Sequence, residues 1–425
     1  MKVSISGIRG IFGNDLLLDN VIDYVSKFAS LLDSKGIKDV IVARDTRHSS
    51  KIIQDVAVAT LLSYGMNIHN LSIVPTPFLF RESRNNAGLM ITSSHNPLEW
   101  NGLKFVIDGR GLFEHELSLL LLMDKIDINI GKEDFIKPSY IEDLSKLNIK
   151  SNARVAVDTT GGAASSYAEE LLSMIGCKVY SLSYDKPDYP DPTTKDLSML
   201  AALMNSNACN LGFAYDLDGD RLVVMYNGRK LKPDATLLLA LANISYNKMA
   251  VSIDTSLAVR DLAELKNSAL IYSKVGEANL IRVMLENDIS IGGEGSSGGF
   301  VYTKFNLCRD GLLASTLIAS MDSKEIDEYL ALSDKYHIIR TKVAAPSDMH
   351  DDIINALEHR LEEDSYHIDR LDGLKGYIDD NTWILIRSSN TEDIIRLSIE
   401  SDDPNKVKKL LNDYESLIKE MVELL

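Results

Sequence analysis

The sequence contains VIVARDT at residues 40–46, VAVDT at residues 155–159 and VSIDT at residues 251–255, three apolar segments that each end in Asp-Thr. Each is rich in β-branched residues, as expected for a parallel strand that helices cover on both faces. The copies lie about 100 residues apart, which is the spacing of domains and not of a solenoid repeat. We therefore predict three related α/β domains, in which each Asp or Thr caps the helix that follows its strand.

The 425 residues of the chain suffice for about three domains, with two to four admissible. After about Val343 the pattern changes to that of a smaller α+β unit. There we expect a helix at residues 351–364, strands at 383–386 and 394–398, and a last helix at 405–424. The expected domains are residues 1–150, 151–247, 248–342 and 343–425. A chance recurrence of common strand-to-helix turns is the alternative to a true repeat.

Acidic residues outnumber basic ones, 62 to 45, which gives a formal net charge of −17. This charge repels nucleic acid, so we expect no such partner, and an anionic substrate must meet locally placed cations. No segment reaches the roughly 18 uninterrupted apolar residues of a membrane span, and Arg9 interrupts the start of the chain. We expect a cytoplasmic protein with no membrane partner. Cys177, Cys209 and Cys308 are too few and too scattered to indicate disulfides or a metal site.

Three carboxylates alternate in YDLDGDR at residues 215–221. In an extended segment, Asp216, Asp218 and Asp220 project to the same side. Two unit charges about 4 Å apart repel by about 4 kcal/mol at an effective dielectric of about 20, so a bound cation is needed. Mg²⁺ fits best, because it takes a few carboxylates together with a phosphate oxygen. An EF-hand is disfavoured because Arg221 stands at the position of its Gly, and an Asp-rich surface turn is the alternative.

A second polar loop, TSSHNP at residues 92–97, follows an apolar strand. It places the Ser94 hydroxyl at the carboxyl end of that strand, where α/β folds bind ligands. A turn in which Ser94 only caps backbone groups is the alternative. A serine hydrolase is disfavoured, because Gly-x-Ser-x-Gly is absent and His95 is poorly placed to act as a base on its neighbour.

Two more loops carry polar groups. GGEGSSGG at residues 292–299 has glycines that permit close approach to a ligand, and Glu294 can accept hydrogen bonds from sugar hydroxyls. WILIRSSNTE at residues 383–392 gathers a guanidinium, hydroxyls and an amide in a turn suited to a phosphate monoester. Each loop alone is a weak signal, and a solvated turn is the alternative for the second.

In combination and in this order, the four loops resemble the α-D-phosphohexomutases, the family of phosphoglucomutases, phosphomannomutases and phosphoglucosamine mutases. The resemblance runs from SGIRG at residues 6–10 through DTR at 45–47 and PTP at 75–77 to RSSNTE at 387–392, so it covers essentially the whole chain. It implies four domains around a central cleft: three related α/β domains with mixed sheets and a smaller α+β C-terminal domain.

The resemblance also implies roles for single residues. Ser94 would be the phosphoserine, and one Mg²⁺ would be bound by a Ser94 phosphate oxygen with Asp216, Asp218 and Asp220. The residues implied to serve proton transfer and charge balance are Lys104, Arg9 and His95. Those implied to contact the substrate are Arg221 at the transferring phosphate, Glu294 and Ser296 at sugar hydroxyls, and Lys274, Arg387, Ser389, Asn390 and Thr391 at the other phosphate.

The implied reaction interconverts hexose 6-phosphate and hexose 1-phosphate through a phosphoserine enzyme, primed by a sugar bisphosphate, and a bisphosphorylated intermediate. We expect glucosamine phosphate as the substrate, with glucose and mannose phosphates as alternatives, and a monomer or a homodimer. A haloacid-dehalogenase-like phosphatase that uses Asp216 as its nucleophile is a more distant alternative, because residues 213–219 resemble the signature of that family. A non-enzymatic sugar-phosphate-binding protein is another.

Overall fold

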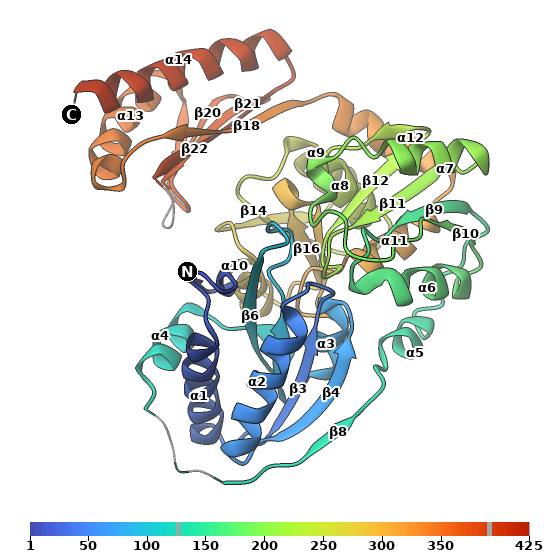
Figure 1. Ribbon diagram of the computed structural model, residues 1–425. Coiled ribbons are helices and arrows are strands. Elements are labelled where there is room, and N and C mark those ends of the chain that lie inside the picture. The colour runs from blue at the N-terminus through green and yellow to red at the C-terminus, as the bar shows by residue number, and fades with distance from the viewer. Residues whose placement is uncertain (125–126, 128, 389–392, 425) are drawn as a thin grey trace.

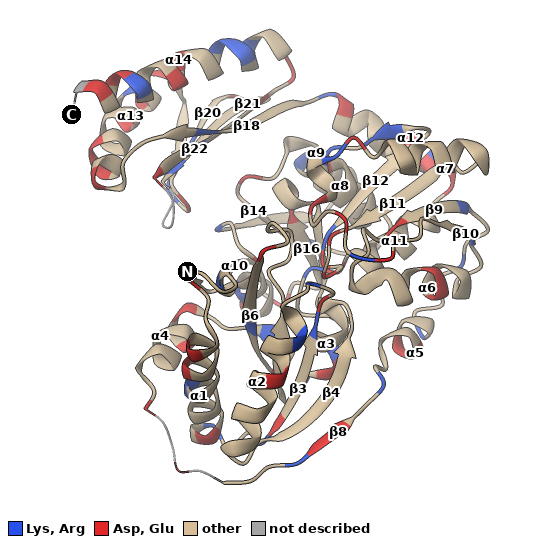
Figure 2. Cartoon of the chain, in the orientation of Figure 1, with Lys and Arg blue, Asp and Glu red and all other residues tan. Residues whose placement is uncertain are grey.

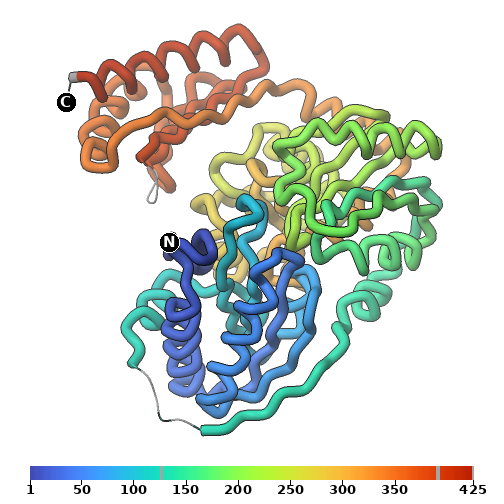
Figure 3. The backbone as a smooth tube through the Cα atoms, viewed as in Figure 1, coloured from blue at the N-terminus to red at the C-terminus, as the bar shows by residue number. Residues whose placement is uncertain are grey.

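The computed structural model describes residues 1–124, 127, 129–388 and 393–424. Four sheets divide the chain into four units that follow one another in sequence (Figure 1). The first is an eight-stranded sheet with the strands β1 (Lys2–Ser4), β2 (Gly7–Ile11), β3 (Asp39–Arg44), β4 (Asn67–Ile73), β5 (Ala87–Ile91), β6 (Trp100–Ile107), β7 (Arg110–Gly111) and β8 (Glu133–Phe135). Its helices are α1 (Leu18–Ser34), α2 (Ser50–Ser63), α3 (Thr76–Glu82), α4 (Glu114–Leu122) and α5 (Tyr140–Ser145). From β8 the chain runs along the outside of this unit to α5 (Figure 3).

The second and third units have smaller sheets. The second contains β9 (Arg154–Asp158), β10 (Lys178–Ser181), β11 (Leu211–Tyr215), β12 (Leu222–Tyr226), β13 (Arg229–Lys230), α6 (Ala168–Met174) and α7 (Ser198–Ser206), with the 3-10 turns η1 (Ala163–Ser166) and η2 (Pro192–Thr194). The third contains β14 (Lys248–Ser252), β15 (Ala269–Ser273), β16 (Ile291–Glu294), β17 (Gly299–Tyr302), α9 (Leu257–Leu265), α10 (Glu277–Glu286), α11 (Gly311–Ala319), α12 (Ser323–Asp334) and the 3-10 turn η3 (Gly295–Ser297). Helix α8 (Pro233–Ala242) connects the two.

One strand order recurs in these three units. It is β4-β3-β5-β6 in the first, β10-β9-β11-β12 in the second and β15-β14-β16-β17 in the third. In each, the Asp-Thr segment forms the second strand of this order and pairs in parallel with both neighbours, while the fourth strand is antiparallel. The shared order confirms the prediction of three related α/β domains with mixed sheets.

A hairpin therefore joins the third and fourth strands of this order in each of the three units. The β5–β6 hairpin carries Ser94, the β11–β12 hairpin carries residues 216–220, and the β16–β17 hairpin carries Glu294. Three of the four predicted site motifs thus occupy one topological position in three copies of the same fold.

The role expected for the Asp-Thr residues as helix caps is wrong. Asp45 and Asp158 instead accept hydrogen bonds within their own loops, from the backbone N–H two residues further on, at 3.0 and 2.9 Å. Helix α9 is capped by Ser256. The loops are long enough for the Asp side chain to form an Asx turn before the helix begins.

The fourth unit is an antiparallel sheet with two helices on one face (Figure 1). Its elements are β18 (His337–Ala344), the 3-10 turn η4 (Ser347–Met349), α13 (His350–Asp364), β19 (His367–Asp369), β20 (Leu374–Asp379), β21 (Thr382–Ser388), β22 (Ile394–Ser401) and α14 (Pro404–Leu424). The predicted two helices and two strands are all present. The sequence did not indicate β18, since its apolar pattern is interrupted by Arg340 and Lys342, which line a pocket.

One expected domain boundary falls inside a strand, and another separates a helix from the sheet that it packs against. Strand β18 crosses the expected boundary at residue 342 and pairs along its whole length with β22. Helix α8 precedes β14 but packs against η3, β16 and β17 of the third unit. We infer that the third unit begins near Lys232 and the fourth near His337. Within the described ranges, no helix is both long enough and apolar enough to cross a membrane.

Candidate active site

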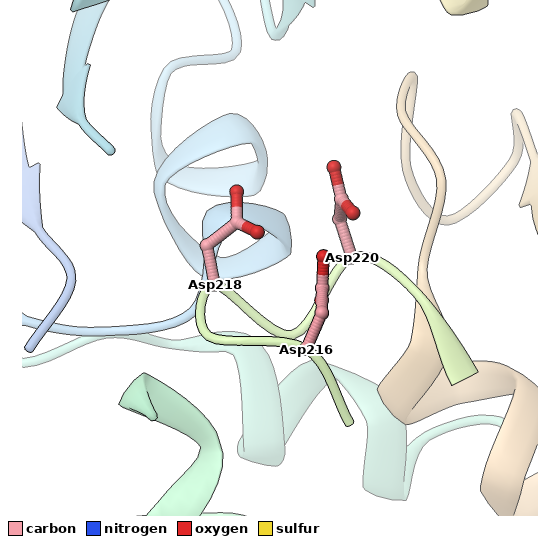
Figure 4. Close-up of side chains that lie close together, drawn as sticks. All are labelled: Asp216, Asp218 and Asp220. Carbon is pink, nitrogen blue, oxygen red and sulfur yellow. The ribbon is translucent and has the colours of Figure 1, made fainter. Parts of the chain in front are cut away.

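The β11–β12 hairpin buries three carboxylates side by side. Asp216, Asp218 and Asp220 each offer an oxygen within 4.8 Å of the others, and all three side chains rise from one tight loop (Figure 4). The loop turns at Gly219, whose φ of +69° favours glycine. The first unit holds the loop from the other side, because the Thr76 N–H donates to the Asp218 carbonyl at 2.8 Å and the Thr76 hydroxyl to Asp218 Oδ2 at 2.7 Å.

Two cations from different units compensate this charge. Lys104 Nζ of β6 lies 2.7 Å from Asp218 Oδ2 and 3.1 Å from Asp220 Oδ2, and Arg309 Nη2 lies 2.9 Å from Asp220 Oδ2. Burial alone would raise the pKa values of these carboxyls, but Lys104 lowers the pKa of Asp218 and Arg309 with Lys104 lowers that of Asp220. Burial and its two acidic neighbours raise the pKa of Asp216. Two of the three carboxylates, Asp218 and Asp220, are thus paired with cations from neighbouring units.

The carboxylates have room for a metal ligand set. Among the described residues, Asp218 Oδ1 and Asp220 Oδ1 are buried and find no hydrogen-bond partner. Buried oxygens without a donor are costly, and a hard cation that prefers carboxylate oxygens satisfies them. The triad could therefore hold a divalent cation.

Ser94 faces this triad from the first unit. Its hydroxyl donates to Asp216 Oδ2 at 3.0 Å, and the side chain is fully buried. Its φ of +51° is unusual for a non-glycine residue, and such strain persists only where surrounding contacts impose it. One such contact is the Thr92 hydroxyl, which accepts from Ser94 N–H at 2.9 Å and donates to Asp45 Oδ2 at 2.7 Å.

Arg47 supplies most of the other contacts that hold the Ser94 loop. The buried Arg47 pairs with Asp45 Oδ2 at 3.0 Å. Its guanidinium donates to the carbonyls of Ser94, Asn96 and Trp100 at 2.5, 2.7 and 2.9 Å. The first Asp-Thr segment thereby fixes the conformation of the hairpin beside it.

Cations gather at this junction although the chain is acidic. Lys and Arg lie beside Asp and Glu where β6, α3 and β16 come together, and outer helices such as α14 also carry both kinds of residue (Figure 2). Burial and the neighbouring Arg221 lower the pKa of Arg9 to about 10 and that of His95 to about 2. His95 is therefore neutral at physiological pH, and the positive charge belongs to Lys104 and the arginines.

Arg309 is a site residue that the sequence did not reveal. Besides Asp220, it donates through Nη1 to Glu294 Oε2 at 3.1 Å, and it pairs through Nε with Glu277 Oε2 at 3.4 Å. A Cβ on Gly299 would lie 2.3 Å from Arg309 Cδ, so this approach requires glycine. Arg309 is a single charged residue between a strand and a helix, so no motif marks it in the sequence. The glycines of residues 292–299 were the one feature that allowed a close neighbour.

The sugar and phosphate contacts expected from sequence lie further along the third and fourth units. Glu294 Oε1 accepts from Gly276 N–H at 2.8 Å, so both of its oxygens are held. Ser296 and Arg387 line one cavity of about 360 Å³ between these units, whereas Lys274 is exposed on the adjoining loop. Ser389, Asn390 and Thr391 lie outside the described residues.

Comparison with known proteins supports this architecture. Phosphoglucomutase/phosphomannomutase domains I, II and III, described as alpha/beta/alpha domains, match residues 1–119, 138–229 and 232–336, and the C-terminal domain matches 339–416. A phosphoglucomutase/phosphomannomutase of Thermococcus kodakarensis is 32% identical over 98% of this chain and 98% of its own length. The chain belongs to the phosphoglucomutase/phosphomannomutase family.

Other members of the phosphoglucomutase/phosphomannomutase family agree in sequence or in fold. A phosphoglucosamine mutase of Methanococcus vannielii is 28% identical over 94% of this chain and 96% of its own. The crystal structure of a family protein from Burkholderia thailandensis superposes with a TM-score of 0.84 at 21% identity, covering 99% of this chain and 98% of that one. The latter likeness shows the four-domain fold.

Lys104→Met should destabilise the protein when divalent cations are removed, because it leaves Asp218 and Asp220 short of one counter-charge. Loss of one partner of a buried ion pair costs about 3 kcal/mol. Added MgCl₂ should then raise the melting temperature of the variant more than that of the wild type, as a bound cation replaces the missing charge. Thermal unfolding in EDTA and in MgCl₂ measures both effects.

The exposed pair of Lys51 and Asp55 provides the control, and Lys51→Met should behave as wild type in both buffers. Equal stability of Lys104→Met and wild type in EDTA would contradict the charge balance described above.

Proposed function

We propose that the chain is a phosphohexomutase that interconverts hexose 6-phosphate and hexose 1-phosphate through phosphorylated Ser94. The observation that carries the proposal is the approach of the Ser94 hydroxyl to within 3.0 Å of Asp216 in a buried cluster of three carboxylates. A seryl oxygen beside a candidate cation site is the arrangement that phosphoryl transfer needs, since this reaction depends on placement and charge neutralisation. Membership of the phosphoglucomutase/phosphomannomutase family supports it.

Asp216, Asp218 and Asp220, with an oxygen of the Ser94 phosphate, would hold one Mg²⁺. When bound, Mg²⁺ would neutralise charge on the transferring phosphoryl group. Arg9, Arg221 and Lys104 would balance the rest of that charge.

A proton must leave the attacking hydroxyl and reach the oxygen that departs. Burial lowers the pKa of Lys104, but Asp218 and Asp220 together raise it by more, so Lys104 carries a proton at physiological pH. We assign the transfer to Lys104, which would give this proton to the departing oxygen and take up the proton that the attacking hydroxyl loses. Neutral His95 adds no charge beside it.

The rest of the substrate would lie toward the third and fourth units. Glu294 and Ser296 would accept or donate hydrogen bonds at the sugar hydroxyls. Lys274, Arg387 and the predicted contacts Ser389, Asn390 and Thr391 would hold the phosphate that is not reacting. A sugar bisphosphate formed at Ser94 would turn end for end and return its other phosphate, so either phosphate must fit the same pocket.

A phosphatase that uses Asp216 as nucleophile is less consistent with this geometry. The Oδ2 atom of Asp216 already accepts a hydrogen bond from the Ser94 hydroxyl.

Ser94→Ala should abolish mutase turnover without changing the melting temperature appreciably, because the hydroxyl makes one contact and carries the phosphate. Steady-state assay with Mg²⁺ and a sugar bisphosphate activator, together with intact-protein mass spectrometry, measures turnover and phosphorylation. Ordinary turnover by the variant, or a hydroxylamine-labile acyl phosphate on Asp216 of the wild type, would refute the assignment. Failure of the wild type to convert any hexose phosphate would favour a non-enzymatic binding protein.

Glucosamine 6-phosphate should be the preferred substrate, followed by the glucose and mannose 6-phosphates. The support is the short chain and the likeness to archaeal relatives that bear the name phosphoglucosamine mutase. Comparison of kcat/KM for the three sugars measures the preference. A tenfold preference for glucose or mannose, about 1.4 kcal/mol in transition-state binding, would reverse it.

Arg387→Ala should raise KM several-fold with little change in kcat, because a contact to the phosphate that does not react stabilises ground state and transition state alike. Arg370→Ala is the matched control, since Arg370 lies in the same unit and pairs with Glu358 on the surface. A large loss of kcat at unchanged KM would place Arg387 at the reacting phosphate instead.

A further inference from the structure

The turn between β19 and β20 reaches from the fourth unit into the third. Asp372 Oδ2 in this turn accepts a hydrogen bond from Val275 N–H at 3.0 Å. The same oxygen forms an ion pair with Arg387 Nε at 2.9 Å. One carboxylate oxygen therefore connects the predicted phosphate-binding arginine to the loop that follows β15.

Both partners of Asp372 belong to parts of the site. Arg387 and Val275 line the cavity of about 360 Å³ between the two units, together with Ser296. The Val275 loop continues into Gly276, whose N–H donates to Glu294 Oε1 at 2.8 Å. Two consecutive backbone N–H groups thus hold two carboxylates, that of Asp372 through Val275 and that of Glu294 through Gly276.

The backbone is shaped for this contact. Gly373 has a φ of +81°, and a Cβ there would lie 2.2 Å from the Ile386 carbonyl and 2.8 Å from Arg387 Cγ. Only glycine allows the turn to lie so close to β21. Gly373 therefore keeps the turn that carries Asp372 beside Arg387.

Other buried contacts fix the third and fourth units relative to each other, so the Val275 loop and the turn that carries Asp372 are held in place. Lys375 Nζ, fully buried, donates to the Ile253 carbonyl at 2.6 Å. Glu400 accepts from Leu257 N–H at 2.8 Å and from the Trp383 indole N–H at 2.7 Å. The fourth unit is therefore seated on the loop that follows the third Asp-Thr segment.

We propose that Asp372 is a positioning residue that holds Arg387 and the Val275 loop on opposite sides of one pocket, so that two units together grip the phosphate that does not react. The nature of the bound anion rests on the function proposed above. A carboxylate that fixes one edge of a guanidinium limits its rotamers and lowers the entropy lost when an anion binds the pocket.

The opposite role makes an opposite prediction. If Asp372 instead competed with phosphate for the Arg387 guanidinium, its removal would free the guanidinium and strengthen anion binding. If it positions Arg387, its removal weakens anion binding. A change in phosphate affinity therefore has a different sign in the two cases.

Asp372→Asn should weaken the binding of inorganic phosphate by roughly fivefold, which is the size of effect that one charged contact exerts on a neighbouring site. It should raise KM for the hexose phosphate by a similar factor and leave kcat within about twofold. Isothermal titration calorimetry and steady-state kinetics measure these values. Asp379→Asn, which removes the ion pair of Asp379 with Lys406 in the same unit, should change neither.

A double-mutant cycle separates positioning from a general structural role. In an Arg387→Ala background, Asp372→Asn should change phosphate affinity by less than about twofold, because the group it positions is gone. An equal loss in both backgrounds, or unchanged or tighter phosphate binding by Asp372→Asn alone, would overturn the proposal. Asp372→Glu keeps the charge and should recover at least half of the loss on a logarithmic scale; no recovery would also count against it.

The calorimetric comparison does not depend on turnover. If the wild-type protein converts no hexose phosphate, the proposed function fails, whereas the sign of the change in phosphate affinity still decides the role of Asp372.

Discussion

Three carboxylates buried on one hairpin carry more charge than a protein interior holds without compensation, and the arrangement of the units follows from that charge. Lys104 comes from the first unit and Arg309 from the third, and each is bonded directly to the carboxylates of the second. Removing either cation would leave buried charge unpaired, so the contacts that compensate the triad also hold three units together. A site of this kind forms only when all three have folded and docked.

The strand order shared by the first three units explains why their site residues lie on equivalent hairpins. The hairpin between the third and fourth strands of the shared order carries a hydroxyl in the first unit, three carboxylates in the second and a carboxylate held by two donors in the third. Equivalent loops of similar domains meet at one junction and differ only in the chemistry they present. The fourth unit has a different, antiparallel sheet, and it adds Arg387 from a strand end.

The sequence predicted the features that depend on local pattern. Apolar segments ending in Asp-Thr indicated the parallel strands, and the alternation of Asp216, Asp218 and Asp220 indicated convergent carboxylates. It did not reveal Arg309 or Asp372, because each is a single charged residue whose partners lie far away in the chain. The expected helix caps were wrong for a related reason, since an Asp after a strand can satisfy the backbone of its own loop as readily as that of the helix.

The separation of the two charged regions bears on how a sugar could react at both ends. The cations around Ser94 belong to the first three units, whereas Arg387 and the Val275 loop border a pocket between the third and fourth. Under the proposed function, the second pocket recognises a phosphate and makes few demands on the carbon that bears it. A sugar bisphosphate that rotates end for end would therefore place its other phosphate in the same pocket, while its hydroxyls exchange positions near Glu294. The sugar contacts must accordingly accept the hydroxyls of the sugar in two orientations. Arg309 and Gly276 fix the Glu294 carboxylate, so its two oxygens are acceptors at defined positions for the hydroxyls in either orientation.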